Sequence, residues 1–168
     1  MKLLRLTTIT LLIISLPACA CLCLQEKSIK KRVATYFKQA DAVFIGVPTE
    51  TIVRQDKTQL DLQGKKLTVY RTKIWVKEIF KGTLTSHVFA ETEITGWSCD
   101  TDPLETHREY VIYATVRTDQ VVAFHPCTGT HSLTGLTDEK LKKEASRELD
   151  LLRKLSEKSQ IATRKAGH

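Results

Sequence analysis

The feature that most constrains this chain is its distribution of cysteines. Three of the five lie at alternate positions, 19, 21 and 23, directly after an apolar run, and the other two are Cys99 and Cys127. Several cysteines in one chain form either a disulfide framework or a metal site, and the redox compartment decides between these two possibilities. The first question is therefore where the protein resides.

The N-terminus has the composition of an export leader. Lys2 and Arg5 precede the apolar stretch "LTTITLLIISL", and "ACA" at 18–20 has the small-x-small pattern that signal peptidase recognises. The apolar run is short for a membrane span. We expect residues 1–20 to be a signal peptide and the mature chain to be exported, secreted or periplasmic. A buried N-terminal helix is the alternative.

Two cleavage sites remain open. Cutting after Ala20 removes Cys19 and leaves four cysteines that can pair as disulfides. "LPAC" at 16–19 instead resembles a bacterial lipobox, which would make Cys19 the lipidated first residue of a membrane-anchored lipoprotein; Pro17 is unusual there. Cys19 leaves the thiol pool in either case, so the even number of remaining cysteines does not distinguish the two.

Hydrophobic periodicity then outlines the fold. Residues 28–40 have helical spacing, and 41–55 read as a strand bent at Gly46 and Pro48. The segment 67–82 predicts a strand with one buried face, because apolar and hydroxyl side chains alternate there with basic ones. The residues expected on the buried face are Thr68, Tyr70, Thr72, Ile74, Val76 and Phe80. Residues 86–94 predict the next strand. Residues 110–127 predict a hairpin that turns near Thr118 and Asp119.

A C-terminal helix completes the pattern. Thr137 is its expected N-cap, Asp138 and Glu139 suit its first turn, and an apolar stripe follows, formed by Leu141, Ala145, Leu149 and Leu152. We expect a domain over 21–158 and a flexible tail over 159–168. About five strands between two helices predict an all-β fold with flanking helices, a five-stranded Greek-key barrel of the OB-fold kind.

The cysteines and their surroundings resemble a known family. A mature start at "CLC", followed by "ADAVFIG", "YRTKIWVKEIFKG", "GWSC", "EYVIYATV" and "PC", is similar to the netrin-like domain of tissue inhibitors of metalloproteinases (TIMPs) and to its bacterial relatives. The resemblance covers residues 21 to about 155. It implies the pairings Cys21–Cys99 and Cys23–Cys127. The second domain and the third first-domain disulfide of the animal inhibitors have no counterpart here.

The resemblance also implies a function. In the family, the amino nitrogen and carbonyl oxygen of the first cysteine, here Cys21, chelate the catalytic zinc of a protease, and the next side chain, here Leu22, enters the neighbouring pocket. Trp97 and Ser98 would join Cys21, Leu22 and Cys23 in one inhibitory ridge. The implied partner is a zinc metalloprotease; the alternative is a non-inhibitory surface module with another protein partner.

Other site types have less support in the sequence. The five histidines show no HExxH or zinc-type spacing, and no catalytic serine motif, phosphate loop or unpaired thiol of the mature chain suggests an enzyme. We expect no cofactor and no intrinsic metal. Asp100, Asp102, Glu105 and His107 could hold a cation but suit a solvated loop. Trp75 among Arg71, Lys73 and Lys77 fits nucleic-acid binding, which export disfavours. We expect membrane contact only through a lipid on Cys19.

Overall fold

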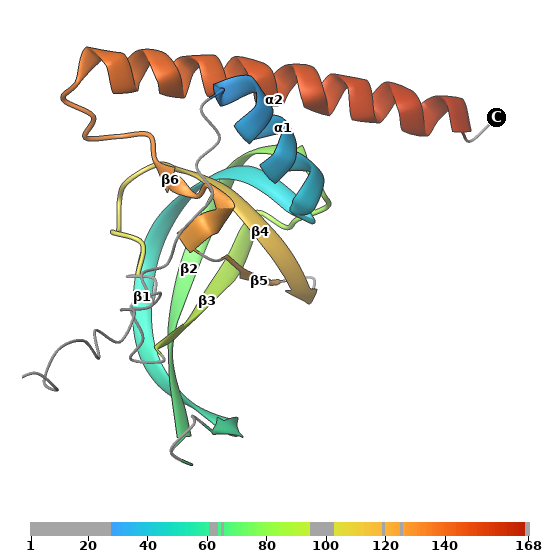
Figure 1. The fold of residues 1–168 in the computed structure, drawn as a ribbon. Helices are drawn as coiled ribbons and strands as arrows, with labels where there is room; N and C mark the ends of the chain where they lie inside the picture. The colour runs from blue at the N-terminus through green and yellow to red at the C-terminus, as the bar shows by residue number, and fades with distance from the viewer. Residues whose placement is uncertain are drawn as a thin grey trace, which may run out of the picture.

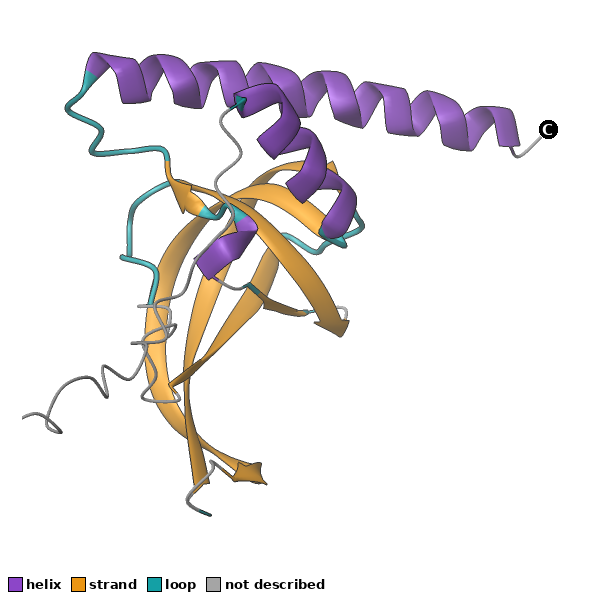
Figure 2. Cartoon of the chain, in the orientation of Figure 1, coloured by secondary structure: helices purple, strands orange, loops and turns teal. Residues whose placement is uncertain are grey.

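The computed structural model describes residues 28–60, 64, 66–94, 103–118, 120–124 and 126–166. Along the chain these form α1 (Ile29–Gln39), β1 (Ala42–Leu60), β2 (Lys66–Lys81), β3 (His87–Ile94), β4 (Tyr110–Thr118), β5 (Val121–Ala123), the 3-10 helix η1 (Pro126–Thr128), β6 (His131–Ser132) and α2 (Glu139–Ala166). Figure 1 shows the two α-helices on one side of a curved sheet, and Figure 2 shows the same view by secondary structure.

Five strands close into a barrel. Their order is β1-β2-β3-β5-β4, and β1 also pairs with β4, which closes the sheet on itself. The β3–β5 pairing is parallel and all the other pairings are antiparallel. This is the Greek-key topology of the OB-fold, so the predicted barrel with a short N-terminal helix and a C-terminal helix is confirmed. The two-residue strand β6, which pairs antiparallel with the first two residues of β4, was not predicted.

β1 closes the barrel because it bends sharply. Its residues 42–46 pair with β4 on one side and β2 on the other, and its register to β2 shifts between Ile45 and Gly46 and again between Pro48 and Glu50. A Cβ at Gly46 would lie 2.5 Å from Cγ2 of Ile74, so only glycine allows this close approach. The bend expected at Gly46 and Pro48 is therefore present.

The core has two parts, one on each side of the sheet. Phe44, Ile74 and Ile112 pack inside the barrel. Val43 and Tyr113, their neighbours in sequence, point outward, where the helices cover them. Because successive strand residues face opposite sides, a strand covered on both sides is apolar throughout. This accounts for the continuous apolar run at the start of β4.

Four details of the prediction need correction. Phe80 packs beneath the helices rather than inside the barrel with Ile74, because a β-bulge between Ile45 and Gly46 shifts the alternation along β2. The backbone N–H of Lys140 donates to Oδ1 of Asp138, so Asp138 caps α2 in place of Thr137. Leu141 is 47% exposed and lies outside the buried stripe. The helix also continues to Ala166, across most of the segment expected to be a tail.

Candidate functional site

All five residues of the predicted ridge lie outside the described residues. These are Cys21, Leu22, Cys23, Trp97 and Ser98, together with Cys99 and the alternative lipidation residue Cys19. Cys127 is described and is disulfide-bonded, and the structure contains no other described cysteine. Both predicted pairings, Cys21–Cys99 and Cys23–Cys127, therefore remain predictions. The site can be built from the elements that flank these segments.

The sheet topology directs the ends of β3 and β5 toward one end of the barrel. β3 and β5 pair in parallel, with Glu91 beside Ala123, so both strands leave the sheet in the same direction. The segment that carries Cys99 follows β3, and η1 with Cys127 follows β5. The end of the barrel at which β3 and β5 finish is therefore the candidate site.

The start of α1 lies at the same end. Ser28 and Ile29 line an open cleft of about 1350 Å³ together with Cys127, Gly129 and His131. Gly129 has φ +86°, and a Cβ there would lie 2.4 Å from Cδ2 of Tyr36, so glycine lets α1 pack directly against the chain that follows Cys127.

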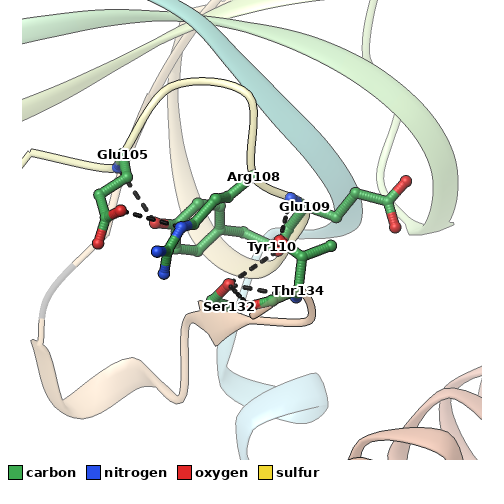
Figure 3. A network of polar contacts seen from close by, with 6 residues as sticks. All are labelled: Glu105, Arg108, Glu109, Tyr110, Ser132 and Thr134. Atoms are coloured by element: carbon green, nitrogen blue, oxygen red, sulfur yellow. Dashed lines mark hydrogen bonds and ion pairs between the residues drawn. The ribbon is translucent and has the colours of Figure 1, made fainter. Parts of the chain in front are cut away.

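Hydrogen bonds fix the loop that follows the Cys99 segment (Figure 3). Leu104 is buried in the barrel core, and the backbone N–H of Glu105 donates to the Tyr110 hydroxyl over 3.1 Å. The backbone N–H of Glu109 donates to Oγ1 of Thr134 over 3.2 Å. His107 has φ 64° and its backbone N–H donates to the Pro48 carbonyl over 2.9 Å. Residues 104–109 are thus held by both the barrel and the segment around β6.

A buried carboxylate connects the helices to this end of the barrel. Glu148 of α2 is 3% exposed, and its Oε1 accepts a hydrogen bond from the Tyr113 hydroxyl over 2.6 Å. Its Oε2 lies 3.9 Å from Nη2 of Arg32 and 3.5 Å from Nε2 of His131. Burial, followed by the nearby Glu148 charge, raises the pKa of Tyr113 far above its usual range.

Sequence reasoning missed Glu148, although a signal was present. The residue lies three positions after Ala145 and four before Leu152, so helical spacing puts a carboxylate on the apolar face of α2. A charged group in that position needs partners, which α1, β4 and β6 supply. This polar cluster joins four elements and fixes the position of α2 over the barrel.

The other candidate residues do not converge on a site. Glu105 pairs with Arg108 over 2.9 Å and both are exposed, and within the described residues no group of three His, Cys, Asp or Glu side chains could hold a metal ion. Asp100 and Asp102 lie outside the described residues. Trp75 is 47% exposed, but Lys77 pairs with Glu109 and Arg71 stacks 4.3 Å from the Phe89 ring centre.

No helix in the described part of the chain is both long and apolar enough to cross a membrane. Neither a protein-family model nor a curated protein matches this sequence.

Proposed function

We propose that the chain is an exported, non-enzymatic binding protein that inhibits zinc metalloproteases through its mature N-terminus. Cys21 would be the first residue of the mature protein and would bind the catalytic zinc of the target. Leu22 would enter the apolar pocket beside that zinc, and Trp97 and Ser98 would contact the same protease surface. The protein would need no cofactor of its own and would not bind nucleic acid.

The observation that carries the proposal is the position of Cys127 beside the start of α1. Ser28 and the disulfide-bonded Cys127 line the same cleft. Cys23 precedes Ser28 by five residues, which span at most about 17 Å when extended. A Cys23–Cys127 bond is therefore within reach, and a second bond from Cys21 to the segment after β3 would meet the same end of the barrel. Both support a rigidly held N-terminus.

The chemistry follows from the open coordination position of a catalytic zinc. That position normally holds a water molecule, which a nitrogen and an oxygen ligand from one residue can displace. The nitrogen must be a free, neutral amine, and an α-amino group has a pKa of about 7.7 to 8.0. A terminus already fixed by disulfides loses little conformational entropy on binding, which favours affinity.

The rival cleavage site leads to the alternative function. If Cys19 were lipidated, the nitrogen of Cys21 would be an amide and could not donate a lone pair to zinc. The protein would then be a non-inhibitory module at the cell surface, bound to another protein. The two functions are mutually exclusive, because the nitrogen of Cys21 is a free amine in one case and an amide in the other.

An inhibition assay with matched N-termini tests the proposal. The chain that begins at Cys21 is titrated against a panel of zinc metalloproteases, and the control retains Ala20, which turns the same nitrogen into an amide. We expect inhibition by the first protein, strengthening as the pH rises from about 6 to 8 because the amine loses its proton. Equal inhibition by both proteins, or none by either, would contradict the proposal.

A further inference from the structure

The positive charge of this protein is concentrated in its two helices. α1 carries four basic and no acidic residues, and α2 carries nine basic and five acidic residues. From residue 21 onward the chain has 24 basic and 19 acidic residues, so the segments outside the helices have 11 basic and 14 acidic ones. The helices are strongly basic and the rest of the mature chain is slightly acidic.

Among the described side chains outside the helices, five of the seven basic groups lie next to a carboxylate. Arg54, Arg71 and Arg117 surround the carboxylate of Glu91 at 2.6 to 3.9 Å. Lys77 and Arg108 each have a carboxylate partner as well. Lys73 is an exposed exception. Lys77 and Arg108 are each balanced by one carboxylate and add little to the field around the protein, whereas the three arginines around the single carboxylate of Glu91 leave a formal excess of two positive charges.

Most exposed basic groups of the helices, within the part of the chain that the structure describes, have no such partners. Eight of them form no ion pair with any described residue, and all eight are exposed. They are Lys30, Lys31, Lys38, Lys140, Lys143, Arg147, Lys154 and Lys158. Arg32, Lys142 and Arg153, which do form ion pairs, lie next to them. Uncompensated charge is therefore collected on the helices.

Four of these residues form a row along α2. The row consists of Lys143, Arg147, Lys154 and Lys158, which are separated by four, seven and four positions in the sequence. Because each residue turns the helix by about 100°, these four side chains fall within one narrow strip of the helix surface. The strip lies away from the buried Leu152, and Lys143 and Lys158 are about 22 Å apart along the axis. The exposed Ile161 continues the row. Two carboxylates border it: Asp150 is paired with Arg153, and Glu157 is exposed.

α1 extends the same basic surface. The cleft between the helices is lined by Arg32 of α1 and by Lys140, Lys143 and Arg147 of α2. Lys31 and Lys38 lie on the side of α1 opposite the buried Val33 and Phe37. Figure 1 shows α1 and α2 together on one side of the barrel, so the molecule has a basic helical side and a barrel side of different charge.

We propose that this helical face binds the surface of an anionic lipid bilayer, independently of any lipid on Cys19. A row of unpaired cations with an exposed isoleucine suits the headgroup region of a membrane, where basic side chains meet anionic lipids and an apolar side chain can insert. Single-stranded nucleic acid is disfavoured because such sites use exposed aromatic rings, whereas Tyr36 packs on Gly129 and Phe37 is buried. The expected export of the chain brings it next to a bilayer.

Vesicle binding tests this proposal with charge-matched variants. The protein without its leader is sedimented with vesicles of phosphatidylcholine containing about a third phosphatidylglycerol, at low salt and at about 0.5 M salt. The test variant is Lys143→Gln, Arg147→Gln and Lys154→Gln. The control is Lys73→Gln, Lys77→Gln and Arg108→Gln, which removes the same charge from outside the helices.

The parent protein is expected to bind the anionic vesicles at low salt but not at high salt, and not to bind vesicles of pure phosphatidylcholine. The test variant should bind about a hundredfold more weakly, about fivefold for each charge, and the control within about threefold of the parent. Equal losses in both variants, binding without phosphatidylglycerol, or retention on an acidic polymer but not on vesicles would overturn the proposal. Protease inhibition by the same preparations is a separate readout, so failure here leaves the zinc-binding proposal standing.

Discussion

Replacing Tyr113 with phenylalanine should destabilise the protein by about 2 kcal/mol, because it leaves the buried Glu148 carboxylate without its best partner. Both residues are nearly inaccessible, at 1% and 3% exposed, and the hydroxyl lies 2.6 Å from Oε1 of Glu148. A hydrogen bond to a charged group contributes about 1.5 to 3 kcal/mol. Phenylalanine preserves the ring packing, so the loss reports on the hydrogen bond.

The other partners of Glu148 should matter less. Arg32 lies 3.9 Å from Oε2 and its side chain is 35% exposed, so solvent screens the pair. We expect Arg32→Gln to cost less than about 1 kcal/mol. We therefore predict that Tyr113→Phe lowers the free energy of unfolding more than Arg32→Gln does.

Urea unfolding at neutral pH with the disulfides intact measures both variants. The midpoint should fall clearly for Tyr113→Phe and slightly for Arg32→Gln, with an unchanged slope if the unfolded states are equally exposed. A loss below about 0.5 kcal/mol for Tyr113→Phe, or a larger loss for Arg32→Gln, would refute the assignment of Tyr113 as the main partner of the buried charge.

Three further predictions follow from the same geometry. The pKa of Tyr113 is raised above that of an unfolded tyrosine, so its contribution to stability is complete below about pH 10 and is lost as the pH rises further; alkaline urea titrations should show a steeper decline for the parent than for Tyr113→Phe. Gly129→Ala should lower the free energy of unfolding, measured by thermal unfolding, by more than about 2 kcal/mol, because φ is +86° and the new Cβ would meet Tyr36. Gly64→Ala, which has open space around it, should lower the free energy of unfolding by about 1 kcal/mol. Asp138→Ala should reduce the unfolding free energy by about 1 kcal/mol and Thr137→Ala should leave it nearly unchanged; the reverse order would restore Thr137 as the cap.

The barrel could be predicted from the sequence because apolar and polar residues alternate along its strands, or because glycine and proline mark where a strand bends. The period-2 pattern around Ile74 gave β2, and Gly46 with Pro48 marked the bend that lets β1 close the sheet. Positions that depend on register were harder. A single bulge moved Phe80 to the other side of the sheet, and no local pattern reveals which side a strand presents after a bulge.

The candidate site was predictable only in outline. The family resemblance implied a ridge formed by the N-terminus and the segment before Cys99, and the structure adds that β3 and β5 run in parallel toward one end of the barrel. The Glu148 cluster was missed because its partners come from α1, β4 and β6, which only the tertiary fold brings together. The basic surface of the helices likewise depends on which lysines find carboxylates in space, which sequence counts do not show.

The most direct test of the central claim is the mass and N-terminal sequence of the mature protein from its native host. The account predicts a chain that begins at Cys21 with a free amine and that is four hydrogens lighter than its reduced form, because two disulfides join its four cysteines. A diacylglyceryl group on Cys19, or any residue retained before Cys21, would contradict it, because the Cys21 nitrogen would then be an amide that cannot bind zinc.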